Sequence, residues 1–294
     1  MGRDGRTRPT TLTWVTLQYR TRAELFAEGL SRRGISDAVA RGDLVRARRD
    51  RYLPGDAADP IVRAVRVGGR LTCLSLLSMN GVFVRSNGRL HVHLRPNDSR
   101  SRSPHDRRRK LTRRGRRGVR LHWAELVQDV GQATCVGVVD ALVHAVLCQS
   151  PRDAIASIDS ALYKGLATQA DIADVFAALP AKFGVLRPLI DGRAESGPET
   201  LMRLLLRGLG CDIALQVNIG GVGRVDIVVD GWLIIECDSF EFHSSWDDQV
   251  EDRRRTLAAA ALGFTTIRPT ARMIMNEPDA VLSAVRGLLA ARRA

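Results

Sequence analysis

The chain has 294 residues, of which 45% are hydrophobic and 26% are charged, so a wholly disordered protein is excluded. No uncharged apolar stretch of about 18 residues occurs, which argues against a membrane partner, and the first residues lack the apolar core of an export signal. Five cysteines without a CxxC pair predict reduced thiols in a cytoplasmic protein, rather than a disulfide framework or a zinc site.

The net charge of +13 is concentrated in the N-terminal part of the chain. Residues 1–125 hold 29 basic and 11 acidic side chains, residues 126–194 hold 5 and 7, and residues 195–294 hold 11 and 14. A bias toward arginine in the coding sequence explains why arginine outnumbers lysine, but it does not explain this segregation. The distribution favours a polyanionic partner for the N-terminal part, and above all nucleic acid.

After a polar tail at residues 1–19, residues 20–57 predict two short helices and a hairpin. Thr21 and Glu24 have the spacing of a capping box, and Ser31 is a suitable cap for a second helix that ends at a glycine. An arginine-rich strand pair follows. This order is that of a winged helix-turn-helix, a DNA-binding module.

In such a module the first turns of the second helix enter the major groove, while the hairpin meets phosphates or a narrow minor groove. The alternatives are a small helical domain with a solvated arginine face, or a hairpin that contacts protein. The candidate DNA-binding residues are Arg32, Arg33, Ser36, Arg46, Arg48, Arg49 and Arg51.

Residues 58–192 predict a connecting domain of mixed α/β structure. Residues 61–81 are mainly helical in pattern, and residues 89–95 alternate as a half-buried strand does. His91 and His93 share one face of that strand at a spacing that zinc can use, but no cysteine or acid is close in sequence, so solvent-facing histidines are favoured. Three more helices are predicted at residues 137–147, 151–163 and 168–179.

Residues 100–120 form the densest charge run, with eleven basic residues and one acid, Asp106. Such a run predicts a mobile loop that clamps a phosphate backbone. The alternative is a disordered basic insertion without a dedicated partner. The candidate nucleic-acid contacts in this loop are Arg107, Arg108, Arg109, Lys110, Arg113 and Arg114.

Residues 193–294 predict a core in the order αβββαβα, so the fold class of the chain is α/β, or α+β overall. The third strand, residues 232–237, is apolar on both faces and is expected to be central in its sheet. The element order differs from that of a dinucleotide-binding fold, and no glycine-rich phosphate loop is present.

Acidic residues interrupt this apolar core. Asp226 lies within the second strand, and Glu236 and Asp238 stand at the end of the central strand, where uncompensated charge is costly. With a three-residue loop at residues 230–232, Asp226 faces Glu236, whereas a two-residue loop breaks that register. Two facing carboxylates repel each other unless a divalent cation lies between them.

A site with hard oxygen ligands suits Mg²⁺ or Mn²⁺, which activate water and stabilise charge on a phosphodiester. His243, just beyond the strand, is predicted to act as general base or to protonate the leaving oxygen. Asp252 and the arginines at 253–255 provide a further acid and cations for phosphate. The alternative is an acidic strand end that is simply paired with those arginines.

A set of motifs in this region resembles the PD-(D/E)xK nuclease superfamily, and within it the branch of very-short-patch-repair endonucleases. The resemblance covers residues 195–291 and implies a restriction-endonuclease-like fold with metal-dependent DNA cleavage. It implies that Asp226 and Glu236 bind the metal, that Glu199 joins them from the preceding helix, and that His243 assists proton transfer. Asp238 takes the place of the usual motif lysine, which that branch also lacks. The matching residues are Gln216, Arg224-Val225-Asp226, Glu236-Cys237-Asp238, His243, Asp252-Arg253-Arg254-Arg255 and Gly263-Phe264.

Residues 20–57 resemble the winged-helix domain of AbiEi-type antitoxins, through Gly29-Leu30-Ser31-Arg32, the stretch 42–46 and Arg51-Tyr52-Leu53. The whole chain is similar to actinobacterial proteins that join such a half to a nuclease-like domain. The leading hypothesis is a duplex-DNA-binding, Mg²⁺-dependent endonuclease in repair or phage defence. The alternative is a non-catalytic antitoxin-type repressor with a degenerate nuclease fold, whose further partner is a toxin or a second copy of the chain. An RNA-directed enzyme is a third hypothesis.

Overall fold

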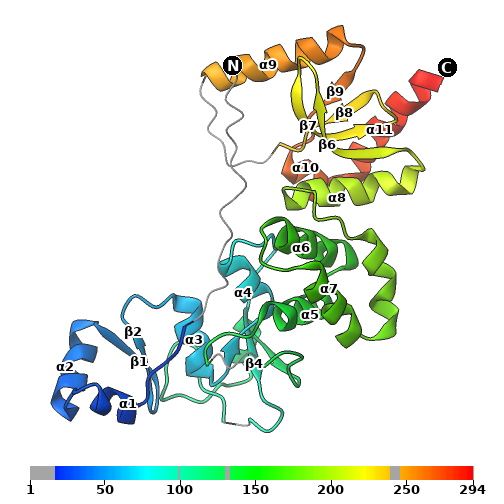
Figure 1. Ribbon diagram of the computed structural model, residues 1–294. Helices are drawn as coiled ribbons and strands as arrows, with labels where there is room; N and C mark the ends of the chain where they lie inside the picture. The colour runs from blue at the N-terminus through cyan, green and yellow to red at the C-terminus, as the bar shows by residue number, and fades with distance from the viewer. Residues whose placement is uncertain (1–16, 99, 130–132, 239–245, 294) are drawn as a thin grey trace. The chain divides into compact units, whose positions relative to one another are not determined.

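The computed structural model describes residues 17–98, 100–129, 133–238 and 246–293 (Figure 1). It is a mixed α/β structure with three separate open sheets. The chain divides into two compact units, one of Met1–Ser150 with Lys164–Gly184, and one of Pro151–Tyr163 with Val185–Ala294. None of the helices in the described ranges is long and apolar enough to cross a membrane.

The N-terminal elements follow the predicted order. The Thr21 hydroxyl accepts a hydrogen bond from the Glu24 N–H, and the Glu24 carboxylate accepts one from the Thr21 N–H, so the predicted capping box is confirmed. The Ser31 cap and a left-handed Gly42, with φ of +86°, delimit the second helix as expected. Side chains of all these elements share one small core. The elements are α1 (Arg22–Ala27), α2 (Arg32–Arg41), β1 (Leu44–Arg48) and β2 (Arg51–Pro54).

The middle region contains a three-stranded sheet in the order β3-β4-β5, in which β4 and β5 run parallel. Gly68, with φ of +115°, ends the first helix and divides the stretch predicted as mainly helical. The strand β4 is the middle strand and is buried at all five positions, so the prediction of a half-buried strand is wrong. The elements are α3 (Asp59–Val67), β3 (Arg70–Leu71), α4 (Cys73–Met79), β4 (Leu90–Leu94) and β5 (Val119–Trp123).

The basic segment at residues 100–120 contains defined local structure. The Ser103 N–H donates to the Arg109 carbonyl at 2.9 Å, and the Asp106 carboxylate accepts the Arg108 N–H at 2.8 Å. A 3₁₀ turn, η1 (Gly115–Gly118), leads directly into β5. The single acid of the run thus organises a turn within the predicted loop, and only the end of the run, from Gly115, enters η1 and β5. The mobility of this loop stays a prediction.

The helical part of the chain agrees with the three predicted helices. In the N-terminal unit α5 packs between α4 and α7, whereas α6 belongs to the C-terminal unit and packs on α8. In that unit Arg203 of α8 forms a buried ion pair with Asp159 of α6 at 2.8 Å. The elements are α5 (Val138–Cys148), α6 (Pro151–Tyr163), α7 (Gln169–Ala178) and the 3₁₀ segment η2 (Ala181–Leu189).

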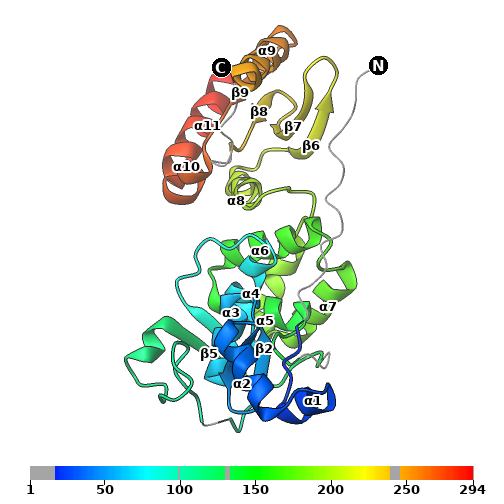
Figure 2. The same ribbon diagram turned by 90° about the vertical axis from the view of Figure 1, so that its left-hand side faces the viewer.

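The C-terminal sheet has the order β6-β7-β8-β9, with β6, β7 and β8 antiparallel and β9 parallel to β8. The predicted element order is confirmed, with one additional short helix, α10. The helix α8 contacts β7, α10 and α11, and α9 lies against β9 (Figure 2). The elements are α8 (Gly197–Leu206), η3 (Arg207–Leu209), β6 (Ile213–Ile219), β7 (Gly223–Val229), β8 (Leu233–Ile235), α9 (Trp246–Ala261), β9 (Thr265–Ile267), α10 (Ala271–Asn276) and α11 (Pro278–Arg293).

Candidate functional site

The hairpin of β7 and β8 has the register that the sequence predicts. Val229 pairs with Leu233 across a three-residue loop, and Ile227 pairs with Ile235, so the next facing positions are those of Asp226 and Glu236. The loop is possible because Asp230 and Gly231 both adopt positive φ, at +49° and +74°. The two carboxylates thus belong to facing positions at the end of the hairpin.

The carboxyl group of Glu199, on α8, interacts with the negative charge of Asp226. Its side chain is buried, and this burial, together with the negative charge of Asp226, raises the pKa of Glu199 to about 7. Burial also raises the pKa of Glu236, again with Asp226 as the second cause, and burial raises the pKa of Asp226 itself. Asp226 is therefore the central member of a coupled set of three acids, which we call the acidic cluster.

Main-chain and amide donors hold two members of the acidic cluster. The Oε2 atom of Glu199 accepts the Glu195 N–H at 2.9 Å and Gln216 Nε2 at 2.8 Å, and Asp226 Oδ2 accepts the Cys237 N–H at 2.8 Å. Neither Glu199 nor Asp226 forms a salt bridge to a residue that the structure describes. Their carboxyl groups are consequently held in place without a cationic partner, which leaves them available to a cation.

Gln216 completes the cluster and was not assigned a role from the sequence. It lies in β6 between the pairs Leu215–Ile227 and Val217–Val225, hence opposite Asp226, and its φ of +53° is unusual for a residue other than glycine. Its Nε2 atom binds Glu199, but its buried Oε1 atom has no hydrogen-bond partner within the described parts of the chain. A buried carbonyl oxygen of this kind requires a water molecule or a cation.

The other predicted members of the site have separate surroundings. Arg255 donates to Glu236 at 3.3 Å and lies 3.8 Å from Asp252, so part of the acidic strand end is paired with arginine, as the alternative interpretation expected. Asp238 is exposed, and its N–H donates to the Pro269 carbonyl at 3.3 Å. Although the residue as a whole is exposed, partial loss of water around its carboxyl group raises the pKa of Asp238, and the positive charge of Arg268 acts in the opposite direction. His243 lies outside the described residues.

The most compact set of metal-binding side chains is a different one. Cys73, His91, His122 and Cys148 have their ligand atoms within 4.8 Å of one another, and in the described ranges no other group of three or more such side chains does. The carboxylate oxygens of Glu199, Asp226 and Glu236 are therefore not all within 4.8 Å of one another, and a cation there would be partly coordinated by water, as is usual for Mg²⁺.

This Cys/His cluster corrects one expectation from the sequence. His91 and His93 are 6% and 3% exposed, so they are not solvent-facing. His91 contacts His122 and two cysteines that lie far away in the sequence, whereas His93 Nε2 lies 2.9 Å from the Ala124 carbonyl oxygen. No short-range pattern such as CxxC could have revealed the set. A hydrogen bond with the Cys73 thiol lowers the pKa of Cys148.

The candidate nucleic-acid residues of α2 are exposed, namely Arg32, Arg33 and Ser36, and so is Arg49 at the hairpin turn. Arg48 differs, because its guanidinium donates to the carbonyls of Val67 at 2.8 Å and Arg100 at 2.7 Å and thereby ties the hairpin to the next region. The remaining hairpin arginines lie over aromatic rings: Arg46 is 5.9 Å from the Tyr52 centroid, and Arg51 is 4.2 Å from that of Tyr19.

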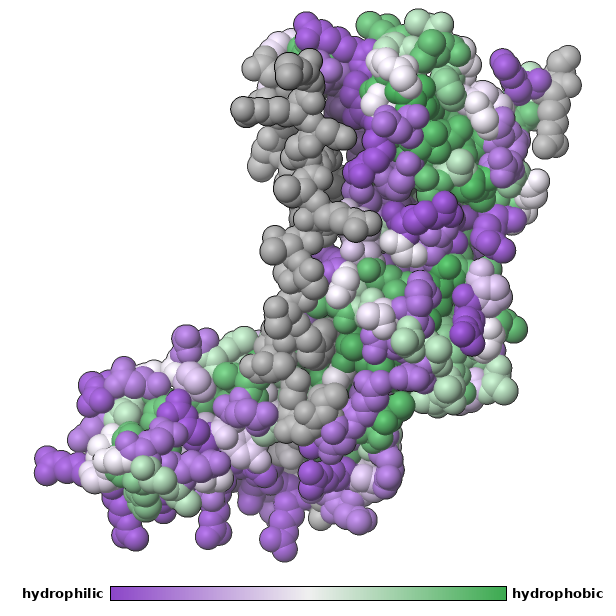
Figure 3. All heavy atoms as spheres, viewed as in Figure 1, coloured by the Kyte–Doolittle hydropathy of each residue, from purple (hydrophilic) through white to green (hydrophobic). Residues whose placement is uncertain are grey.

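Residues from two predicted DNA-binding segments line one cleft of about 310 Å³. Arg32 and Ser36 of α2, Arg46 of β1 and Arg107 of the basic segment all face it. The surface of the N-terminal elements is rich in hydrophilic side chains (Figure 3). The other candidates of the basic segment are exposed: Arg108, Arg109, Lys110, Arg113 and Arg114. The structure thus joins helix, hairpin and basic segment in one cationic surface.

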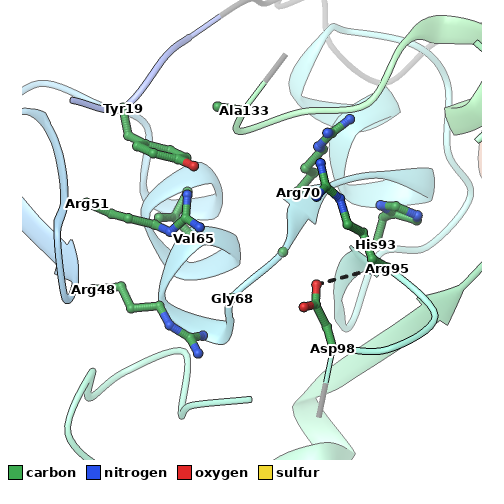
Figure 4. A pocket seen from close by; sticks show the side chains of 11 residues that line it. Tyr19, Arg48, Arg51, Val65, Gly68, Arg70, His93, Arg95, Asp98 and Ala133 are labelled. Carbon is green, nitrogen blue, oxygen red and sulfur yellow. Dashed lines mark hydrogen bonds between the residues drawn. The ribbon is translucent and has the colours of Figure 1, made fainter. Parts of the chain in front are cut away.

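A second basic cavity, of about 400 Å³, is lined by other residues of the hairpin. Arg48 and Arg51 face Arg70 and Arg95 across it, and the Arg95 N–H donates to Asp98 at 3.3 Å (Figure 4). Arg48 and Arg51 therefore contribute to this cavity rather than to the cleft beside α2.

No protein-family model matches the chain, and no curated protein or solved structure is significantly similar to it.

Proposed function

We propose that this protein binds duplex DNA and hydrolyses phosphodiester bonds with Mg²⁺ or Mn²⁺ at the acidic cluster. The observation that carries the proposal is the pair of the buried Glu199 and the half-buried Asp226, which has no cationic partner in the described residues and lies beside the unpartnered oxygen of Gln216. In this proposal the C-terminal unit is a restriction-endonuclease-like core, and α1 to β2 form a winged helix-turn-helix. The protein acts in the cytoplasm, in repair or phage defence.

The acidic cluster provides oxygen ligands for the cation from three elements. Asp226, Glu236 and Glu199 would hold it, and a divalent cation at such a site supplies an activated water and stabilises the charge of the phosphodiester. Because the pKa of Glu199 is about 7, this carboxyl can also take up or release a proton at neutral pH. We assign proton transfer at the leaving oxygen to His243, and a supporting role to Asp238.

The charge distribution explains how a polyanion reaches an acidic site. Residues 1–125 carry an excess of 18 positive charges and residues 195–294 an excess of 3 negative charges. Arg32 and Arg33 on α2, with the basic segment, hold the phosphate backbone, so that the C-terminal unit does not need to attract DNA by itself.

The test is cleavage of supercoiled and mismatched duplex DNA in the presence of Mg²⁺, Mn²⁺ or EDTA. Asp226→Ala and Glu236→Ala should abolish metal-dependent nicking, because each removes a ligand. Glu251→Ala is the matched control, since Glu251 is an exposed acid on α9 whose partner is Arg254. Equal cleavage by the wild type and both site variants would refute the assignment.

Two observations favour a second function, that of a non-catalytic AbiEi-type repressor. Arg255 already pairs with Glu236, and Asp238 stands where the nuclease motif has lysine, so the cluster can equally be a degenerate site. A repressor would bind its own promoter tightly and with strong salt dependence, and Asp226→Ala would not change that binding. Its protein partner would be a toxin or a second copy of the chain.

A further inference from the structure

We propose that Cys73, His91, His122 and Cys148 bind one Zn²⁺ ion in a closed, four-ligand site within the N-terminal unit. This site is separate from the acidic cluster in its residues and in its chemistry. Two thiolates and two imidazoles are soft and borderline ligands, which select zinc rather than Mg²⁺.

The spacing of the ligand atoms fits a tetrahedral ion. His91 Nδ1 lies 3.1 Å from His122 Nε2, and Cys148 Sγ lies 4.0 Å from the same nitrogen. With Zn–N near 2.0 Å and Zn–S near 2.3 Å, tetrahedral geometry places two nitrogens roughly 3.3 Å apart, and a nitrogen and a sulfur roughly 3.6 Å apart. These two separations differ from the tetrahedral ones by only a few tenths of an ångström, and the Cys73 thiol completes a set whose four ligand atoms all lie within 4.8 Å of one another.

Four different elements supply the ligands. His91 and His122 come from the neighbouring parallel strands β4 and β5, Cys73 is the first residue of α4, and Cys148 is the last residue of α5. Cys73 has a φ of +53°, a conformation that costs energy for a residue with a side chain. The backbone therefore holds the Cys73 thiol at this position in a strained conformation.

The neighbouring side chains support the ligands and are themselves engaged. The His144 ring stacks on His122 with centroids 4.6 Å apart, and its Nδ1 atom lies 2.8 Å from the Thr72 hydroxyl. The main-chain N–H of His91 donates to the Ser75 hydroxyl at 3.0 Å and so ties β4 to α4 beside the cluster. The stacked His144 ring restricts the orientation of the His122 imidazole, and His144 itself is not one of the four grouped ligand side chains.

Four protein ligands leave no position open for a substrate, so the site is structural rather than catalytic. It would join α4, β4, β5 and α5 at one point. The basic segment leaves the sheet after β4 and returns in β5, so the ion would also anchor both ends of that segment. We therefore expect zinc to stabilise the N-terminal unit, without any requirement for it in phosphodiester chemistry.

The decisive measurement is the zinc content of the full chain, purified without chelator and exhaustively dialysed, together with the absorption spectrum after exchange with Co²⁺. We expect an equimolar amount of zinc, and visible and near-ultraviolet Co²⁺ bands typical of tetrahedral thiolate coordination. Cys148→Ser and His122→Ala should lose the metal or change the spectrum. Cys135→Ala is the matched control, because Cys135 is buried in the same unit outside the cluster.

Two results would overturn the proposal: a folded wild-type chain that takes up no zinc or holds another metal in its place, or a Co²⁺ spectrum that is the same in Cys148→Ser as in the wild type. If the variants do not fold, removal and return of zinc to the wild type decides the question. The thermal stability of the N-terminal unit must then fall with a chelator and recover with zinc alone. Asp226→Ala should retain the zinc, which separates this proposal from the nuclease.

Discussion

Replacing Glu199 by glutamine should stabilise the protein at neutral and alkaline pH while it abolishes metal-dependent cleavage. In the absence of a cation, the ionised Glu199 is buried next to Asp226, which is unfavourable. Glutamine has nearly the same shape, and its carbonyl oxygen can accept the two hydrogen bonds that Oε2 receives from Glu195 and Gln216. Its amide group can donate to Asp226, where the carboxylate only repels.

The magnitude follows from the pKa of Glu199. The pKa is about 7 in the folded chain, against an ordinary value of 4.5. A raised carboxyl pKa means that the folded chain binds the proton more tightly, so stability is complete below about pH 4.5 and falls as the pH rises through 7. At about 1.4 kcal/mol per pH unit, the wild type loses about 3 kcal/mol across this interval, and the glutamine variant does not.

The assay is guanidinium unfolding of the chain in EDTA, followed by tryptophan fluorescence at several pH values between 4 and 8.5; Trp232 and Trp246 report on the C-terminal unit. The stability advantage of Glu199→Gln should grow by about 3 kcal/mol between pH 4.5 and 8. Glu251→Gln, at an exposed position, should show no such growth. If the advantage does not depend on pH, or if Glu199→Gln is less stable than the wild type at pH 8, the acidic cluster is not strained as we argue.

Three further predictions concern metal binding, the fold and the DNA contacts. The affinity for Mg²⁺, measured by calorimetry, should rise as the pH increases through 7, because Glu199 must lose its proton to bind the ion. Asp159→Ala should lower the unfolding free energy by about 3–5 kcal/mol in a denaturant titration, because it leaves Arg203 buried without its partner. Arg33→Ala should weaken DNA binding and reduce the slope of log K against log salt by about 1, whereas Arg48→Ala should chiefly destabilise the N-terminal unit, as a thermal melt would show.

Features that depend on neighbouring residues could be predicted from the sequence. The caps of α1 and α2 follow from single hydroxyl side chains at Thr21 and Ser31, because such a cap bonds to an amide three residues away. The facing positions of Asp226 and Glu236 follow from the length of one loop, since a hairpin fixes the register of both its strands.

Features that depend on distant pairing could not be predicted. The strand β5 follows directly after a basic run, and charge alone suggested a loop there. Without β5 there was no reason to place His122 beside His91, because parallel strands need a long crossover that no local pattern specifies. The left-handed conformation of Gln216 was equally hidden, since the residue type alone does not indicate it.

Because we propose two metal sites, loss of DNA cleavage after metal removal must be assigned to one site or the other. A chelator removes an ion from an open, water-coordinated carboxylate site and can also remove zinc from the Cys/His cluster, so loss of cleavage in EDTA does not by itself show which site performs the chemistry. Restoration by Mg²⁺ alone, after zinc has been removed, would assign hydrolysis to the acidic cluster. Restoration that needs zinc as well would mean that the N-terminal unit must be held in shape before DNA reaches Asp226. If zinc alone restores cleavage and Asp226→Ala cleaves normally, the acidic cluster has no catalytic role.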